Sequence, residues 1–463
     1  MKTQWFKKAV AMCLSLFMVL SLAACSGGST DSQSETSSEA GSEGTSSEAS
    51  SGEKLVVSLA TTNDPTGDDM NQRKYANFWM PIIEEYEATY PDREVEYTSY
   101  VWETIDAKLM SDYAAGIERG VSQFNSSQLA TLYKNGALAS LQPIWDGWTD
   151  EQRANYEWQD LSPYQNDGQF YVLPMQIDER IFCYRKDLFE EAGLDPEKPP
   201  KTVDELVEYA KLLTKDDVYG LGIYLGNEEG TAEVSYNPLI WYYGGETWDV
   251  ETKEATFASD AGVQAAQFLS DCVNTWKITP EFSLSGRRED VVQTPFINNQ
   301  YAMITGCGSY WLPNFEAAGM ISGIAPPTED QDMGNLGFFH IDGWNWYTNS
   351  WDVGICANCT YQEEAMDLIR IILDPEHLKY IEDSLPANLA VYDEPQYKNS
   401  PTYDEYKYAI ETGKFAVPTA NYKNLTLSIS AAVQEVITTN DASKTAEIMK
   451  RYQDEYNAQY AGK

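Results

Sequence analysis

Histidine and basic residues are scarce in this chain of 463 residues. Its two histidines, His340 and His377, exclude a metal site built from several histidines and leave two candidates for histidine-based catalysis. Lys and Arg total 32 against 72 Asp and Glu, which gives a formal net charge of -40. A surface of that charge repels DNA, RNA and anionic lipid headgroups. We therefore expect no nucleic-acid partner.

Long apolar runs are also missing, apart from one at the start of the chain. Lysines precede the apolar stretch 9–22, which is the order of a secretory signal peptide, and the stretch is too short for a membrane span. It ends in Leu-Ala-Ala-Cys25, which resembles a bacterial lipobox. We expect residues 1–24 to be a lipoprotein signal peptide and Cys25 to carry lipid. Ordinary cleavage beside an incidental cysteine is the alternative.

A segment rich in Ser and Gly follows the cysteine that we expect to carry lipid. Residues 26–52 contain acids but no Lys or Arg, and they cannot bury enough apolar surface to fold. We expect residues 25–52 to be a lipidated cysteine and a disordered linker. A flexible coil of this length reaches roughly 30 Å. The sequence thus predicts a body tethered to the extracellular face of the bacterial cell membrane.

Cysteine usage gives no disulfide framework. The body holds five cysteines, an odd number, at positions 183, 272, 307, 356 and 359. The spacing of Cys356 and Cys359 suits a redox or zinc pair, but a structural zinc site needs four ligands and no second pair lies nearby. We expect no metal site and free thiols, although a disulfide between these two remains open.

Catalytic motifs are largely absent, and the body alternates strands with helices. It has no P-loop, no H-E-x-x-H and no G-x-S-x-G. The run 55–59 is typical of a buried strand, 75–89 of a helix, 95–97 of a strand and 103–117 of a helix. Thr202 to Glu205 is a capping box before an apolar helical stripe, and a second stripe spans 429–437. The alternation predicts an α/β fold with mainly parallel sheets.

Four stretches together resemble a known family. They are LATLYKNGALASL (129–141), GQFYVLPMQIDERIFCYRKDLFEEAG (168–193), PPKTVDELVEYAKLL (199–213) and AMITGCGSYWLP (302–313). From about residue 54 to the end, the chain resembles the extracellular solute-binding proteins of ABC importers, most closely the cluster that binds maltose and other oligosaccharides. Two positions depart from the family pattern: the segment 116–120, near an expected ligand loop, and Arg185, where asparagine is usual.

The resemblance implies two α/β lobes of the type II periplasmic-binding-protein fold, with the ligand in the cleft between them. By analogy the N-terminal lobe comprises residues 54–176 and 352–376, and the C-terminal lobe 181–343 and 386–463. Hinge segments are expected near 177–180, 344–351 and 375–385. This arrangement follows from the resemblance and not from the periodicity.

The residues also indicate what the cleft binds. Tyr (31) and Trp (13) are abundant, and their rings suit the flat faces of sugars, whereas Asp, Asn and Gln suit hydroxyl groups. In this way we expect ligand contacts from Asn63, Asp64, Trp102, Asn125, Ser126, Gln128, Asp178, Tyr236, Trp241, Tyr310, Trp311, Trp344, Trp346 and Trp351. The structural alternatives are interlobe packing for Trp344, Trp346 and Trp351, and core packing for Tyr310 and Trp311. They are a helix cap for Asn125 or Ser126, and an ion pair with Arg180 for Asp178. A solvated surface position is the alternative for Asn63, Asp64, Trp102, Tyr236 and Trp241, and Trp241 could also be part of the core.

These observations predict a monomeric oligosaccharide-binding lipoprotein that closes around its ligand and docks on the permease of an ABC transporter. It needs no cofactor and makes or breaks no bond. One alternative is a protein of the same fold that binds a peptide or an acidic solute. A second is a surface-tethered glycoside hydrolase or lyase, and a third is an inert surface scaffold.

Overall fold

The strands assemble into two main sheets. In this computed structural model, which describes residues 54–62, 75–101, 104–325, 327–382 and 384–462, one sheet has six strands in the order β14-β6-β13-β3-β1-β2, and the other has four in the order β12-β7-β11-β8. The first sheet comprises β1 (Leu55–Thr61), β2 (Arg93–Ser99), β3 (Val121–Asn125), β6 (Val172–Asp178), β13 (Asn349–Ile355) and β14 (Leu385–Pro386). The second comprises β7 (Arg180–Arg185), β8 (Tyr219–Gly222), β11 (Tyr301–Gly308) and β12 (Leu336–Phe339). Two small hairpins pair β4 (Gln165–Asn166) with β5 (Gln169–Phe170) and β9 (Trp248–Asp249) with β10 (Glu254–Ala255).

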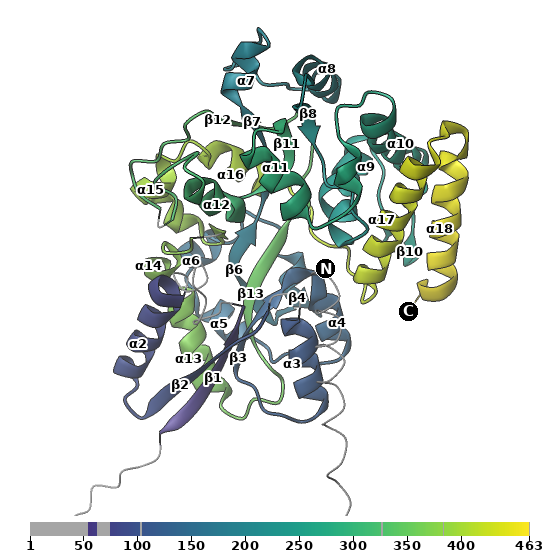
Figure 1. Ribbon diagram of the computed structural model, residues 1–463. Helices are drawn as coiled ribbons and strands as arrows, with labels where there is room; N and C mark the ends of the chain where they lie inside the picture. Colours follow the sequence, from purple (N-terminus) through teal and green to yellow (C-terminus); the bar gives the residue numbers. More distant parts are fainter. Residues whose placement is uncertain (1–53, 63–74, 102–103, 326, 383, 463) are drawn as a thin grey trace, which may run out of the picture. The chain divides into compact units, whose positions relative to one another are not determined.

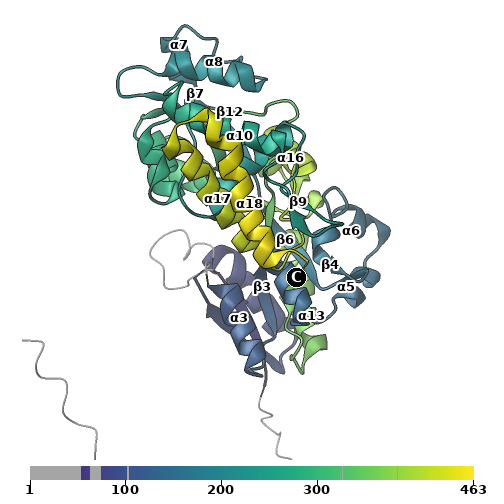
Figure 2. The same ribbon diagram turned by 90° about the vertical axis from the view of Figure 1, so that its right-hand side faces the viewer.

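Helices cover these sheets. They are α2 (Met80–Thr89), α3 (Ile105–Ala114), α4 (Leu129–Lys134), α5 (Gln142–Gly147), α6 (Asp150–Ala154), α7 (Lys186–Glu191), α8 (Val203–Leu213), α9 (Asn237–Tyr242), α10 (Asp260–Asn274), α11 (Thr294–Ile297), α12 (Leu312–Ala317), α13 (Gln362–Ile372), α14 (Pro375–Leu378), α15 (Pro395–Lys398), α16 (Tyr403–Thr412), α17 (Tyr422–Thr439) and α18 (Thr445–Tyr460). Short turns matter at the site, namely η2 (Ser126–Gln128), η4 (Thr231–Tyr236), η6 (Glu289–Gln293) and η7 (Ser309–Trp311). Figures 1 and 2 show α10, α17 and α18 packed side by side.

The expected elements are present. β1, β2 and α3 lie where the sequence predicted them, and the predicted helix 75–89 is a short π-type turn, η1 (Tyr75–Trp79), followed by α2. Both apolar stripes are buried: Val203, Leu206, Val207, Ala210 and Leu213 on α8, and Ile429, Ala432, Val433, Val436 and Ile437 on α17. Helical periodicity predicts such stripes well, because only one face of each helix packs inward.

The capping box forms only in part. The Thr202 hydroxyl accepts a hydrogen bond from the Glu205 backbone N–H at 3.2 Å, as predicted. The Glu205 carboxylate instead accepts from the backbone N–H of Lys201 at 2.8 Å. The return half of the box is therefore displaced by one residue.

The prediction of mainly parallel sheets was wrong. β1 pairs in parallel with β2 and β3, and β11 with β8, but β13 runs antiparallel to both β3 and β6, and β7 antiparallel to β11 and β12. The strands that pass from one sheet toward the other cause this difference. A single residue separates the end of β6 at Asp178 from the start of β7 in the second sheet. β13 enters the first sheet from the direction opposite to β6.

Candidate functional site

The two sheets meet at the single residue between β6 and β7. Asp178, Glu179 and Arg180 are all buried there, with Glu179 completely enclosed. One guanidinium nitrogen of Arg180 donates to the carbonyl oxygens of Asp178 at 3.1 Å and Tyr347 at 3.0 Å. Arg180 thereby ties this crossover to the segment that leads into β13. Ser384, beside β14, donates to the Asp178 carboxylate at 2.6 Å. Three separate chain segments therefore meet at this junction.

Asp178 was expected either to face a ligand or to form an ion pair with Arg180. Arg180 contacts the backbone oxygen of Asp178 and not its carboxylate. The carboxylate is 9% exposed and accepts from Ser384. Its contact with a ligand therefore stays a prediction.

The polar residues after β3 mostly hold the chain in place. The Asn125 side chain accepts from the backbone N–H and the hydroxyl of Ser127, at 3.1 and 2.6 Å, and so caps η2. The buried Ser126 hydroxyl donates to the Asn349 side chain at 2.8 Å and accepts from the Ser350 backbone N–H at 2.9 Å. These bonds fasten the end of β3 to the start of β13. Gln128 makes one longer bond, of 3.4 Å, to Ser127. The capping alternative thus accounts for Asn125, and Gln128 is the least committed of the predicted polar contacts.

The two tryptophans before β13 pack against the second sheet. Trp344 and Trp346 are 3% and 1% exposed, and their ring centroids lie 5.2 and 4.9 Å from that of Phe182 on β7. The packing alternative accounts for both positions. Trp351 lies on β13, where it is aligned with Asn125 on one side and Gln176 on the other. It is therefore beside the junction, in the first sheet.

A second aromatic group follows β11. Tyr310 is partly exposed and Trp311 is buried, and the guanidinium carbon of Arg288 lies 5.4 and 4.9 Å from their ring centroids. Gly308, just before this turn, is aligned with Arg180 across the sheet. The turn η7, Arg288 and Arg180 therefore form one wall of the junction.

Tyr236, on η4, and Trp241, on α9, are both buried. The fully buried Tyr236 hydroxyl donates to the Phe257 carbonyl oxygen at 2.5 Å. Trp241 is 8% exposed, and the ammonium of Lys414 lies 5.2 Å from its ring. Core packing, the alternative noted for Trp241, describes both. Asn63, Asp64, Trp102 and Cys25 lie outside the described residues.

Carboxyl groups near the junction have strongly perturbed pKa values. Burial raises the pKa of Glu179 to about 8, against the opposing effects of Thr348 and Arg180. Burial, with the nearby charge of Glu229, raises the pKa of Glu233 to about 7, and Arg180, Tyr422 and Tyr347 lower it only in part. Burial also raises the pKa of Asp352 on β13 well above its usual range. The site thus contains acids that are at least partly neutral near pH 7.

Sequence reasoning missed several of these groups. Glu179 and Glu233 did not stand out because acidic residues occur throughout the chain. Tyr347 and Tyr422 have stacked rings, with centroids 6.2 Å apart, although they belong to distant segments. The position of Glu179 between two apolar strand patterns was the one available signal, since a charged residue there has to be accommodated inside the protein.

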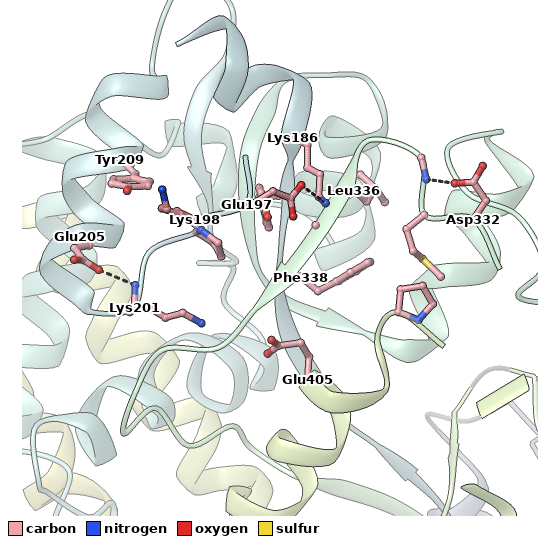
Figure 3. A pocket seen from close by; sticks show the side chains of 16 residues that line it. Lys186, Glu197, Lys198, Lys201, Glu205, Tyr209, Asp332, Leu336, Phe338 and Glu405 are labelled. Carbon is pink, nitrogen blue, oxygen red and sulfur yellow. Dashed lines mark hydrogen bonds and ion pairs between the residues drawn. The ribbon is translucent and has the colours of Figure 1, made fainter. Parts of the chain in front are cut away.

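A separate groove lies on the second lobe. It has a volume of about 680 Å³ and runs along the edge strand β12, with Lys186, Lys198 and Lys201 in its lining (Figure 3). Lys186 is ion-paired with Glu197 at 2.9 Å. None of the predicted ligand residues lines this groove.

The described cysteines are free thiols. All five, at positions 183, 272, 307, 356 and 359, are buried and unpaired with one another. Burial raises the pKa values of Cys356 and Cys359 to about 11. Within the described residues there is no group of three or more His, Cys, Asp or Glu side chains placed to hold a metal ion.

Comparison with known proteins identifies the family. The model of the bacterial extracellular solute-binding protein family matches residues 71–379, and the chain belongs to that family. A binding protein of Brucella abortus (strain 2308) is 28% identical over 266 residues, which are 53% of this chain and 62% of the relative. The sn-glycerol-3-phosphate-binding periplasmic protein UgpB of Escherichia coli (strain K12) is 30% identical over 129 residues, or 24% of this chain and 30% of the relative. The chain thus spans about three fifths of the first of these relatives.

Solved structures share the fold. The solute-binding protein of an ABC transporter from Thermotoga lettingae, bound with α-D-tagatose, has a TM-score of 0.71 at 21% identity, covering 88% of this chain and 99% of that one. The maltose-bound MalE3 of T. maritima has a TM-score of 0.68 at 20% identity, covering 87% and 99%. The predicted family and the two-lobed α/β fold are therefore confirmed. Among the described residues, no helix is both long enough and apolar enough to span a bilayer.

Proposed function

We propose that this protein captures an oligosaccharide between its two lobes and delivers it to the permease of an ABC importer. The observation that carries the proposal is the junction itself. Polar and aromatic side chains of both sheets lie near the crossover from β6 to β7, which is a single residue long. Sugars need this combination, because their C–H faces stack on aromatic rings and their hydroxyl groups pair with polar side chains.

Binding would favour closure of the lobes. In this proposal the lobes comprise residues 54–176 with 352–376 and residues 181–343 with 386–463. A ligand that contacts both lobes stabilises the closed state over the open one. A shift from 1:99 to 99:1 requires about 5.5 kcal/mol of differential binding. Stacked rings together with several hydrogen bonds can supply that amount.

Within the predicted set, we propose that Tyr310, Trp351, Asp178 and Gln128 contact the ligand and that the buried Trp311 supports the neighbouring Tyr310 ring. Tyr310 and Trp311 lie on the wall of the second lobe, and Trp351 and Gln128 on the first. Asp178 lies on the crossover itself.

The decisive experiment is a calorimetric titration of residues 53–463 with xylo-, gluco-, manno-, malto- and arabino-oligosaccharides. Each series is tested beside its monosaccharide, and the sugar is recovered afterwards. Saturable 1:1 binding of one series, with intact sugar, supports the proposal. No binding across the panel would contradict capture of a neutral oligosaccharide and favour a peptide or an acidic solute. Cleaved products would reveal a glycoside hydrolase or lyase.

A matched pair of tyrosine variants locates the site. Tyr310→Ala should weaken binding roughly tenfold or more, because it removes a ring from the proposed stacking surface. Tyr460→Ala is the control, since Tyr460 is partly exposed like Tyr310 and lies at the end of α18, outside the expected hinge segments. Equal effects of the two substitutions would remove Tyr310 from the site.

Membrane attachment is tested separately. We propose that lipid on Cys25 tethers the protein to the extracellular face of the membrane. Cys25→Ala should move the exported protein from the detergent phase to the aqueous phase in a phase-partition assay. Cys13→Ala is the control, because Cys13 lies within the proposed signal peptide and should not change the partition. Partition of Cys25→Ala into detergent would refute the tether.

A further inference from the structure

Two arginines approach the same turn of the second lobe. Arg180 begins β7 and is aligned with Gly308, the last residue of β11. Arg288 lies over the rings of Tyr310 and Trp311, which directly follow Gly308 in η7. The backbone of Arg180 and the guanidinium of Arg288 therefore lie beside the same short segment, and the two side chains are close enough to interact electrostatically.

Neither arginine has a carboxylate partner within 4.0 Å among the described residues. Arg180 is 6% exposed, its two side-chain hydrogen bonds go to neutral carbonyl oxygens, and its Nε has no hydrogen-bond partner. Among the described residues, no group makes a hydrogen bond or an ion pair with the Arg288 side chain, which lies against the two aromatic rings. Other arginines of the described chain are paired at 2.6 to 2.9 Å: Arg93 with Asp367, Arg119 with Asp112, and Arg185 with Asp187.

This arrangement is unusual for the chain. Acids outnumber bases by more than two to one, so a partner carboxylate would be easy to supply. A buried cation without a partner, such as Arg180, is costly, and a second, partly buried cation near it adds to that cost. Burial, and to a smaller extent the charge of Arg180, lower the pKa of Arg288 to about 10, against the opposing charges of Glu289 and Glu233. Glu233 also lies near both arginines, but its raised pKa leaves it a weak counter-charge near neutral pH.

We propose that Arg180 and Arg288 receive an anionic substituent of the sugar ligand, a carboxylate, a sulfate ester or a phosphate ester. This inference rests on the proposed function and narrows its ligand to acidic saccharides. A guanidinium group presents a planar fork that matches such anions, and Tyr310 and Trp311 hold the Arg288 fork against one wall. The net charge of -40 repels anions in general, so recognition would depend on this local pair.

The test compares saccharides that share a backbone and differ in one charged group. Calorimetric titrations of the wild-type protein use neutral oligosaccharides beside their uronate, sulfated and phosphorylated counterparts, with inorganic sulfate and phosphate as further arms. We expect one anionic form to bind roughly 10- to 100-fold more tightly than its neutral backbone. The charged form that binds more tightly than its neutral backbone identifies the anion that the arginines recognise. If only inorganic sulfate or phosphate binds, the ligand of the two arginines is a simple oxyanion and not a saccharide, which would overturn the proposal.

Arg288→Gln is the informative variant, because Arg180 also joins the β6–β7 crossover to the segment before β13, and its substitution would remove those bonds as well. Arg288→Gln should abolish the preference for the anionic saccharide, so that the anionic and neutral forms bind with similar affinity. Arg287→Gln is the control, since the neighbouring Arg287 is 64% exposed and lies 3.9 Å from Glu289. It should retain the preference.

The outcomes separate this inference from the proposed function. Equal wild-type affinity for neutral and anionic forms would overturn the arginine site but keep the oligosaccharide proposal. Equal loss of both forms in Arg288→Gln would show that Arg288 only supports the structure, which also overturns the inference. Failure of every saccharide to bind would overturn both.

Discussion

Glu179→Gln tests the electrostatics of the crossover between β6 and β7. The Glu179 side chain is fully buried, and its pKa is about 8 against 4.5 for an ordinary glutamate. Below about pH 4.5 both the folded and the unfolded states hold the proton, so the full stability is present. As the pH rises toward 8, the unfolded state loses the proton first and the free energy of unfolding falls. Glutamine has the same shape and cannot titrate.

The magnitude follows from the pKa difference. One group contributes a slope of about 1.4 kcal/mol per pH unit between its two pKa values, or about 2 to 3 kcal/mol between pH 5 and pH 7. The free energy of unfolding of Glu179→Gln should therefore decline less steeply with pH than that of the wild type, by that amount. The variant should gain relative stability as the pH rises.

Urea unfolding followed by tryptophan fluorescence at pH 5, 6, 7 and 8 measures this difference. Glu197→Gln is the control, because that carboxylate is 73% exposed and should leave the pH profile parallel to the wild type. Parallel curves for Glu179→Gln and wild type would refute the reasoning. A variant that loses most stability at pH 8 would show that Glu179 is ionised and needed as a counter-charge.

Three further predictions concern the same region. Ser126→Ala should lower the free energy of unfolding by roughly 2 to 4 kcal/mol in urea denaturation, because it removes one hydrogen bond and orphans a buried N–H; a change below 0.5 kcal/mol would contradict this. Binding of an anionic saccharide should weaken from pH 6 to pH 8 as Glu233, beside Glu229, gains charge, and calorimetry of Glu233→Gln should show a flatter profile. Cys356 and Cys359 should react with a thiol reagent at pH 8 far more slowly in folded than in unfolded protein, because their pKa values near 11 leave little thiolate; equal rates would refute their burial.

Local patterns predicted much of the framework. The stripe on α8 and the stripe on α17 are buried as expected, because helical spacing alone decides which face can pack. The strand directions were predicted less well. The crossing strand β13 runs antiparallel to β6, which depends on how the chain returns between sheets and not on any local run of residues.

The candidate site was likewise predicted only in part: its position in the chain was predictable, but its bonding was not. The segments around Asp178, Ser126 and Trp311 all lie on the elements that form the junction. Their bonding was less predictable, since Ser126 is committed to Asn349 and Ser350, residues far away in the sequence. A polar residue type indicates what a side chain can bind, but its neighbours in space decide whether that capacity is free.

The sequence by itself determined the alternation of strands and helices, the apolar faces that form the core, the acidic surface and the motifs that indicated the family. Tertiary structure alone decided that Trp344 and Trp346 pack against Phe182. It also decided that Arg180 and Arg288 come near the same turn, with no carboxylate partner among the residues that the structure describes. The physical reason is the distance along the chain over which each effect acts. Periodicity and capping act over a few residues, whereas burial, charge pairing and pKa shifts depend on groups that only the folded chain brings together.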